Sequence, residues 1–179
     1  MDTCELYLAN EKHKEQYFEF LAECIQDIKD RGFEFFIPIS DKGTFEQDIK
    51  KLSDFHEGKS LPEGWVPASV YWLIRESDKK IIGVITVRHR LAGYLYFRGG
   101  HISYYIRPSE RRKGYATKML SLSLKKCMDL NIDKVMITCA KNNIGSARTI
   151  QKNGGVLHSE DVEDEEVFQR YWIYMPSQP

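Results

Sequence analysis

Hydrophobic residues recur along this chain with two alternating periods, and the alternation predicts a mixed α/β protein. Apolar runs and period-two patterns predict strands at residues 3–9, 70–76, 81–91, 101–107 and 133–140, with two more between residues 156 and 175. Apolar positions three and four residues apart predict helices at residues 11–31, 44–55, 114–130 and 143–150. Because a helix separates strands 101–107 and 133–140, we expect a right-handed crossover between parallel strands.

The strand-to-helix junction RRKGYAT, residues 111–117, carries the first candidate chemistry. The first turn of a helix has backbone N–H groups without carbonyl partners, and the helix dipole adds partial positive charge there, so it attracts anions. Gly114 and Ala116 let a phosphate approach the backbone, and cationic donors lie beside it at Arg111, Arg112 and Lys113. The junction therefore predicts a pyrophosphate site; the alternative is a basic turn that only starts the helix.

Composition and charge exclude several classes of protein. The chain has 179 residues, 42% of them hydrophobic and 29% charged, which is ordinary for one domain spanning residues 1–179. Its 26 basic and 26 acidic residues give a formal net charge of +0, so no bulk field attracts nucleic acid or an anionic membrane. No segment resembles a secretion signal or reaches membrane-spanning length, so we expect a cytoplasmic protein. Neither a metal site nor a disulfide framework fits the four separated cysteines, Cys4, Cys24, Cys127 and Cys139.

Residues 106–116, IRPSERRKGYA, resemble the acyl-CoA signature of the Gcn5-related N-acetyltransferases, the GNAT family. In that family a strand ends in aliphatic-x-Pro and is followed by Arg/Gln-x-x-Gly-x-Gly/Ala; these positions fall on Ile106, Pro108, Arg111, Gly114 and Ala116. A second family pattern, Asn-x-x-Ser/Ala with a Lys-x-Gly ending, falls on Asn143, Ser146, Lys152 and Gly154. The resemblance spans residues 70–155 and is loose before them.

The resemblance implies a fold and a cosubstrate. The fold is α/β (α+β), the GNAT fold, with a mixed central sheet of about seven strands, splayed central parallel strands and about four flanking helices. The cosubstrate is acetyl-CoA, and no metal is implied. The residues expected to bind acetyl-CoA lie in strand 101–107, in the junction and in helix 143–150: Tyr104, Tyr105, Ile106, Arg111, Arg112, Lys113, Gly114, Tyr115, Ala116, Thr117, Asn143, Ser146 and Lys152.

The implied activity is transfer of the acetyl group to a primary amine of a small molecule or peptide by direct attack in a ternary complex. Many family members carry a tyrosine on the last helix as the general acid, but Ile150 stands at that position here. The nearest ionisable substitutes are Tyr105 and His101, because histidine titrates near neutrality; a strand histidine without a catalytic role is the alternative. Weaker candidates are Glu34 and Glu110. The missing tyrosine also leaves open a catalytically silent acyl-CoA-binding module of the same fold.

The identity of the acceptor amine stays open. Aromatic residues near the first helices, Phe33, Phe35, Phe36 and Trp65, line an acceptor pocket or pack under the sheet. The acidic stretch within residues 160–166 predicts a solvated loop, and the functional alternative is a docking edge for a cationic acceptor. A homodimer through the last strands is a further expectation.

Overall fold

The computed structural model of the protein describes residues 2–31 and 44–176. The strands are β1 (Cys4–Leu8), β2 (Ala68–Arg75), β3 (Ile81–Arg88), β4 (Ile102–Ile106), β5 (Lys134–Ala140), β6 (Val156–Glu163) and β7 (Glu166–Tyr174). The α-helices are α1 (Lys14–Arg31), α2 (Phe45–His56), α3 (Tyr115–Asp129) and α4 (Ile144–Lys152). Short 3-10 turns lie between them at η1 (Glu11–His13), η2 (Gly93–Tyr96) and η3 (Pro108–Glu110). The predicted helices and strands are confirmed, with ends that differ by a few residues.

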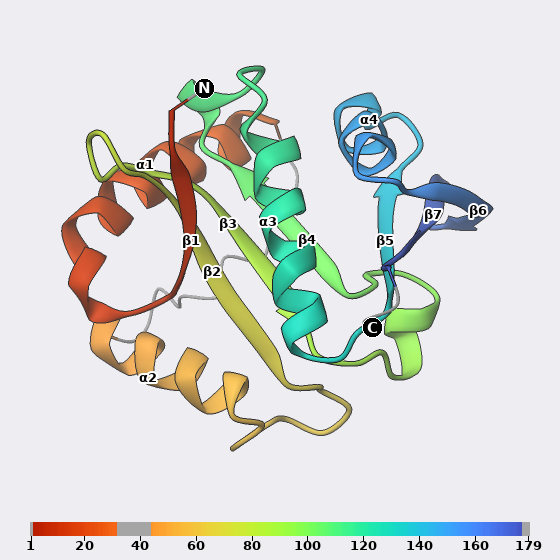
Figure 1. The fold of residues 1–179 in the computed structure, drawn as a ribbon, viewed down its shortest axis with the longest axis horizontal. Coiled ribbons are helices and arrows are strands. Elements are labelled where there is room, and N and C mark those ends of the chain that lie inside the picture. Colours follow the sequence, from red (N-terminus) through yellow and green to blue (C-terminus); the bar gives the residue numbers. More distant parts are fainter. Residues whose placement is uncertain (1, 32–43, 177–179) are drawn as a thin grey trace.

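The first four strands form an antiparallel sheet in the order β1-β2-β3-β4, with α1 and α2 on one face and α3 on the other (Figure 1). Alternate residues of β2 face the two layers. Trp72 stacks on Tyr17 of α1, with ring centroids 5.2 Å apart, whereas Leu73 belongs to the cluster that contains Met119 of α3. Because both faces are covered, β2 and β3 are continuous apolar runs in the sequence.

The last three strands form a second sheet in the order β5-β7-β6, and α4 follows β5 directly. An isolated bridge between Gly100 and Ile137 joins the two sheets. Beside it, the backbone N–H of His101 donates to the carbonyl of Met136 over 2.8 Å. Since α3 leads from the end of β4 back to the start of β5, these two strands point the same way and diverge from the bridge (Figure 1).

This arrangement confirms the mixed α/β class and the splayed central strands, and it corrects one detail. The seven strands fall into two sheets rather than one central sheet. The crossover from β4 through α3 to β5 is present, but it brings two sheets side by side. Hydrophobic periodicity assigns strands but does not determine which strand edges pair, so it does not predict this division.

Because the strands form two sheets, β4 has a free edge that faces β5, and this edge matters for function. Arg107 donates its N–H to Ile82, and His101 accepts from the N–H of Arg88, so the odd-numbered residues of this stretch pair with β3. In an antiparallel ladder the residues between them turn their backbone groups to the opposite side. The amides of Tyr104 and Ile106 therefore face the gap between β4 and β5.

Gly83 in β3 has no side chain, which allows β3 and β4 to lie close together at this position. A Cβ at this position would lie 2.6 Å from the Tyr105 carbonyl oxygen and 2.9 Å from Cδ1 of Ile106. We expect Gly83→Ala to lower the free energy of unfolding by about 1 to 3 kcal/mol, because backbone atoms must shift. Urea denaturation measures this.

The matched control for Gly83→Ala is Gly145→Ala in α4, where the nearest atom to a new Cβ is Oδ1 of Asn143 at 3.6 Å. Alanine favours a helix over glycine by up to about 1 kcal/mol, so this variant is expected to be neutral or more stable. Equal stability of Gly83→Ala and the wild type would contradict the tight contact between β3 and β4.

Candidate active site

The N-terminus of α3 is open to an anion. Its N-cap residue, Gly114, has a left-handed backbone with φ of +86° and provides no side-chain cap, and the first turn contains no acidic residue. The N–H of Lys118 bonds the Gly114 carbonyl, so the three preceding amides, those of residues 115–117, lie ahead of the helical ladder. Three backbone donors and the positive end of the helix dipole therefore meet at one point.

The side chains of this first turn anchor it from behind. Tyr115 is buried, and its hydroxyl accepts a hydrogen bond from Arg75 over 3.2 Å. Ala116 packs against the same core. The Thr117 carbonyl accepts from the Asn153 side chain at the end of α4 over 3.3 Å. The side chains of Tyr115 and Ala116 thus face the core, and the backbone amides of this turn face away from it.

The three cations of the junction do different things. The guanidinium of Arg111 forms two hydrogen bonds with the carboxylate of Asp27 in α1, at 2.9 and 2.7 Å. Lys113 bonds Glu110 over 3.0 Å. Arg112 is exposed, and its left-handed backbone, with φ of +63°, helps to reverse the chain before Gly114. Arg111 and Lys113 thus hold the turn in shape, while Arg112 stays at the surface.

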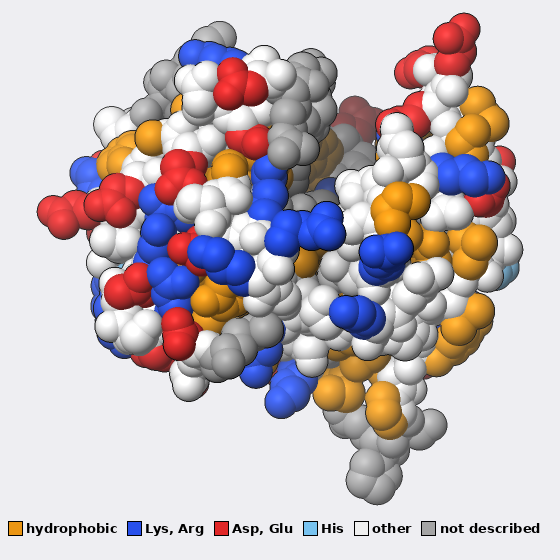
Figure 2. Space-filling view, turned by 90° about the horizontal axis from the view of Figure 1, so that it is seen from above, with side chains coloured by type: hydrophobic (Ala, Val, Ile, Leu, Met, Phe, Trp, Pro, Cys, Tyr) orange, Lys and Arg blue, Asp and Glu red, His pale blue; other side chains and the backbone are white. Residues whose placement is uncertain are grey.

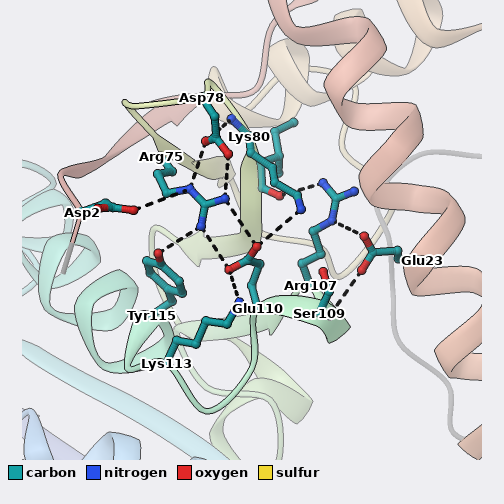
Figure 3. Close-up of polar contacts among 11 residues, drawn as sticks. Asp2, Glu23, Arg75, Asp78, Lys80, Arg107, Ser109, Glu110, Lys113 and Tyr115 are labelled. Atoms are coloured by element: carbon teal, nitrogen blue, oxygen red, sulfur yellow. Dashed lines mark hydrogen bonds and ion pairs between the residues drawn. The ribbon is translucent and has the colours of Figure 1, made fainter.

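Glu110 is the buried centre of an ion-pair network (Figure 3). Its carboxylate, 6% exposed, lies 3.1 Å from Arg75, 3.4 Å from Lys80 and 3.0 Å from Lys113. Burial by itself would raise the pKa of Glu110, but Lys113 and Arg75 hold it below its usual value. A carboxylate so enclosed is a structural anion rather than a proton acceptor, and it ties η3 to the β2–β3 hairpin.

Helix α1 holds the other side of the turn through two carboxylates one helical turn apart. Glu23 accepts from Nε of Arg107 over 2.6 Å and from the N–H of Ser109 over 3.3 Å (Figure 3). Asp27 binds Arg111 and also accepts from the Tyr105 hydroxyl over 2.6 Å. Neither acid was predicted from the sequence. The pattern that could have indicated them is two carboxylates four residues apart, beside the apolar stripe of α1.

Tyr105 belongs to this α1 contact. The Arg111 guanidinium lies over its ring at 5.0 Å. Burial, together with the hydrogen bond to Asp27, raises the pKa of the Tyr105 hydroxyl. Its side chain is on the α1 face of β4, away from α4, so these contacts favour a role in positioning the turn over proton transfer.

His101 closes the narrow end of the gap. It precedes β4, is 7% exposed, and its ring Nδ1 accepts from the backbone N–H of Met136 over 3.0 Å. The proton of the neutral ring therefore lies on Nε2. Burial, reinforced by Arg88, lowers the pKa of His101 to about 4. A neutral ring whose acceptor nitrogen is already bonded suits a joint between the sheets better than the proton acceptor expected from the sequence.

The other side of the gap is formed by α4. Asn143 caps this helix, its Oδ1 accepting from the N–H of Ser146 over 3.0 Å. The hydroxyl of Tyr104 reaches across from β4 and donates to Oγ of Ser146 over 3.2 Å. Ile150 is fully buried in the core, and Lys152 is exposed in the last turn of the helix. The structure thus brings together the predicted residues Tyr104, Asn143 and Ser146.

Basic side chains gather on the face that contains the start of α3. Figure 2 shows Lys and Arg side chains gathered across the middle of this face, beside a hollow between its two halves. A cavity of about 600 Å³ lies elsewhere, at the C-terminal end of α3, where its lining includes Met128, Asp133 and Lys134. The anion-binding groups are on the first face, so we place the candidate site there.

The family model of the acetyltransferase (GNAT) domain matches residues 40–156, more than half of the chain. The chain belongs to the GNAT acetyltransferases. Among curated proteins none matches it. The family uses acetyl-CoA, and the protein is an acetyltransferase.

Solved GNAT structures share the fold at low sequence identity. Ribosomal-protein-S5-alanine acetyltransferase from Vibrio fischeri is 14% identical, with a TM-score of 0.70 over 97% of this chain and 94% of that one. The ribosomal L7/L12 alpha-N-protein acetyltransferase RimL in complex with coenzyme A is 15% identical, with a TM-score of 0.65 over 97% and 94%. A chimera of spermidine N-acetyltransferase SpeG from Vibrio cholerae and hSSAT is 16% identical, with a TM-score of 0.63 over 96% and 95%.

The acceptor side of this GNAT domain is only partly described. Phe33, Glu34, Phe35 and Phe36 lie outside the described residues, and Trp65 is half-exposed with its ring 5.6 Å from that of Phe55. Most acids of the β6–β7 hairpin are paired within the fold: Glu160 with Lys141, Asp161 with Arg170, and Glu163 and Glu166 with Arg98. These pairs favour a structural hairpin over a docking edge for a cationic acceptor.

Within residues 2–31 and 44–176 no group of three or more His, Cys, Asp or Glu side chains is arranged to hold a metal ion. Within the same ranges no helix is both long enough and apolar enough to cross a bilayer. Cys4, Cys24 and Cys127 are buried free thiols, and Cys139 is a partly buried free thiol.

Asp27→Asn tests the anchor of the turn. Asp27 is 11% exposed and Arg111 26%, so removing the carboxylate charge leaves Arg111 poorly compensated. We expect a loss of about 2 kcal/mol in unfolding free energy and weaker acetyl-CoA binding, measured by denaturation and calorimetry. The control is Asp30→Asn, whose carboxylate on the same helix accepts a local hydrogen bond from Gln26. Equal effects of the two variants would contradict the anchor.

His101→Asn tests the joint between the sheets. Asparagine can present an acceptor to the Met136 N–H but does not titrate. Because folding lowers the pKa of His101 to about 4 from 6.5, the unfolded chain binds the extra proton first, and stability falls as pH drops from 6.5 towards 4. We expect the wild type to lose about 3 kcal/mol more than the variant over this window. Parallel stability curves against pH would contradict the assignment.

Proposed function

We propose that this acetyltransferase is an acetyl-CoA-dependent N-acetyltransferase that passes the acetyl group directly to a primary amine in a ternary complex. The observation that carries the proposal is the open N-terminus of α3, next to a strand edge whose amides face the gap between β4 and β5. An anion site and a row of backbone donors in one line match a ligand with a pyrophosphate and an amide-containing arm.

The donor set fits this ligand. Backbone amides of residues 115–117 would hold the pyrophosphate, with Arg112 as the cationic side chain at the surface. The side chains of Asn143 and Ser146 would contact the pantetheine arm from α4, and the backbone of Tyr104 and Ile106 would contact it from β4. Lys152 would meet the outer phosphate end. Acids near the turn are already paired with cations, so they do not repel the phosphates.

Acetyl-CoA supplies the activated acyl group as a thioester, and the chain positions it for attack. A backbone N–H on the free edge of β4 would polarise the carbonyl oxygen as negative charge develops there. No protein nucleophile is needed, in keeping with Cys139, whose thiol pKa is raised by burial to about 11. The amine must arrive neutral, because only the free base carries the attacking lone pair.

The names of the similar structures give a range of acceptor amines to test. The similar structures are named for an alanine at a ribosomal protein, the α-amino group of a ribosomal protein and spermidine. We propose a primary amine within this range. A homodimer is proposed through β6, an edge strand that exposes Val156 and Val162.

A second candidate is a silent acyl-CoA-binding module. It is favoured by Ile150, which buries an apolar side chain where many family members carry the acidic tyrosine. The two functions differ in turnover alone, since both require the cofactor site.

The test combines binding with turnover. In a thermal-shift titration, acetyl-CoA at about 100 times its dissociation constant should add roughly 2.7 kcal/mol of stability, and ATP should add none at the same concentration. Thiol release is then followed with spermidine and with a peptide that has a free α-amino group. Binding with turnover supports the transferase, and binding without turnover supports the silent module. No shift with acetyl-CoA would overturn both.

A further inference from the structure

The gap between β4 and α4 contains a titratable side chain that the proposed function leaves unused. Tyr104 projects from β4 to the face of α3 and α4, opposite to Tyr105, and packs at the edge of the main core. Its hydroxyl donates to Ser146 over 3.2 Å. The hydroxyl thus lies at the first turn of α4, on the side of the gap that Asn143 caps.

The position of Tyr104 matters because Ile150 cannot donate a proton. Ile150 is fully buried, and its Cγ2 lies so close to Gly155 that a Cβ there would be 2.3 Å away. Ser146, one turn before Ile150, and Thr149, directly before it, form hydrogen bonds that lower the pKa of Tyr104. The polar groups at this point of the gap therefore converge on the Tyr104 hydroxyl.

We propose that Tyr104 is the catalytic acid of this protein, donating from β4 the proton that a tyrosine on the last helix would otherwise supply. Ser146 is its positioning residue. The inference rests on the proposed N-acetyltransferase function.

The proposed acetyl transfer balances in atoms and charge. As the amine nitrogen bonds to the acyl carbon, the carbon–sulfur bond breaks and its electron pair stays on sulfur. Tyr104 gives its hydroxyl proton to that sulfur, producing the free thiol. The Ser146 hydroxyl then turns to donate to the phenolate, which regains a proton from water, while the new amide nitrogen releases one to water.

Burial suits Tyr104 to remain protonated until it is used. Burial raises the pKa of Tyr104 to about 12, with Ser146 opposing the shift. The side chain of Tyr104 is partly exposed, so a ligand in the gap can reach it. Cys139 of β5 lies near enough to raise the pKa of Tyr104 further.

The first experiment compares Tyr104→Phe with the wild type, using Tyr96→Phe as the control because Tyr96 is exposed on η2. Loss of a general acid lowers kcat by about 100-fold, and KM for acetyl-CoA should stay within about threefold. Calorimetry of acetyl-CoA and melting temperatures of the free proteins are recorded beside the kinetics. Ser146→Ala should give a smaller fall in kcat than Tyr104→Phe.

A second readout needs no acceptor. A hydroxyl donor facing the sulfur stabilises its thiolate form, so the affinity of the wild type for free CoA should rise by about threefold or more between pH 7 and 9.5. The affinity of Tyr104→Phe should stay flat over the same range. If the affinity for free CoA rises with pH in the wild type but not in Tyr104→Phe, the assignment is supported even when turnover with the chosen amines is slow.

The outcomes separate the two proposals. If the wild type releases thiol and Tyr104→Phe retains kcat, or if the variant loses acetyl-CoA binding rather than kcat, the assignment of Tyr104 is wrong and the transferase stands. If the wild type binds acetyl-CoA but releases no thiol with any amine or with water, the transferase function fails and the acid role falls with it.

Discussion

The free edge of β4 is the constraint on which the rest of this structure depends. A strand edge inside a protein exposes amides that must find partners, and here the partner strand β5 diverges instead of pairing. At the closed end, Met136 bonds both the backbone and the ring of His101. At the open end, Arg111 satisfies the Ile106 carbonyl over 3.2 Å. Between these ends β4 and β5 belong to different sheets, so the gap is maintained from both sides.

Paired charges rather than net charge shape the turn that precedes α3. The protein has a formal net charge of +0, yet cations surround the start of α3, and their acids lie behind the turn on α1 and η3. Glu110, Glu23 and Asp27 each hold at least one arginine in place, and buried pairs of this kind fix geometry more than they add stability. The amides of the first turn of α3 can then face a phosphate without carboxylates in front of them.

The titratable groups near the gap have different hydrogen-bond partners, depending on the face of β4 on which they lie. Tyr105 on the α1 face donates to a carboxylate, and His101 is held neutral at the joint, so both are engaged in structure. Tyr104, one residue along the same strand, points to the opposite face and meets hydroxyl groups. The alternation of a β-strand thus gives adjacent tyrosines different chemistry.

Local patterns in the sequence determined the helices, the strands and the turn that starts α3, because each depends on near neighbours: the spacing of apolar residues, Gly114 at a helix start, Asn143 as a cap. They did not determine the partners of the charged side chains. Asp27 and Arg111 are far apart in the chain, and only the packing of α1 against the turn shows that Arg111 is committed to a carboxylate. The division into two sheets and the faces of Tyr104 and Tyr105 were likewise decided by strand register, a tertiary property that period-two patterns leave open.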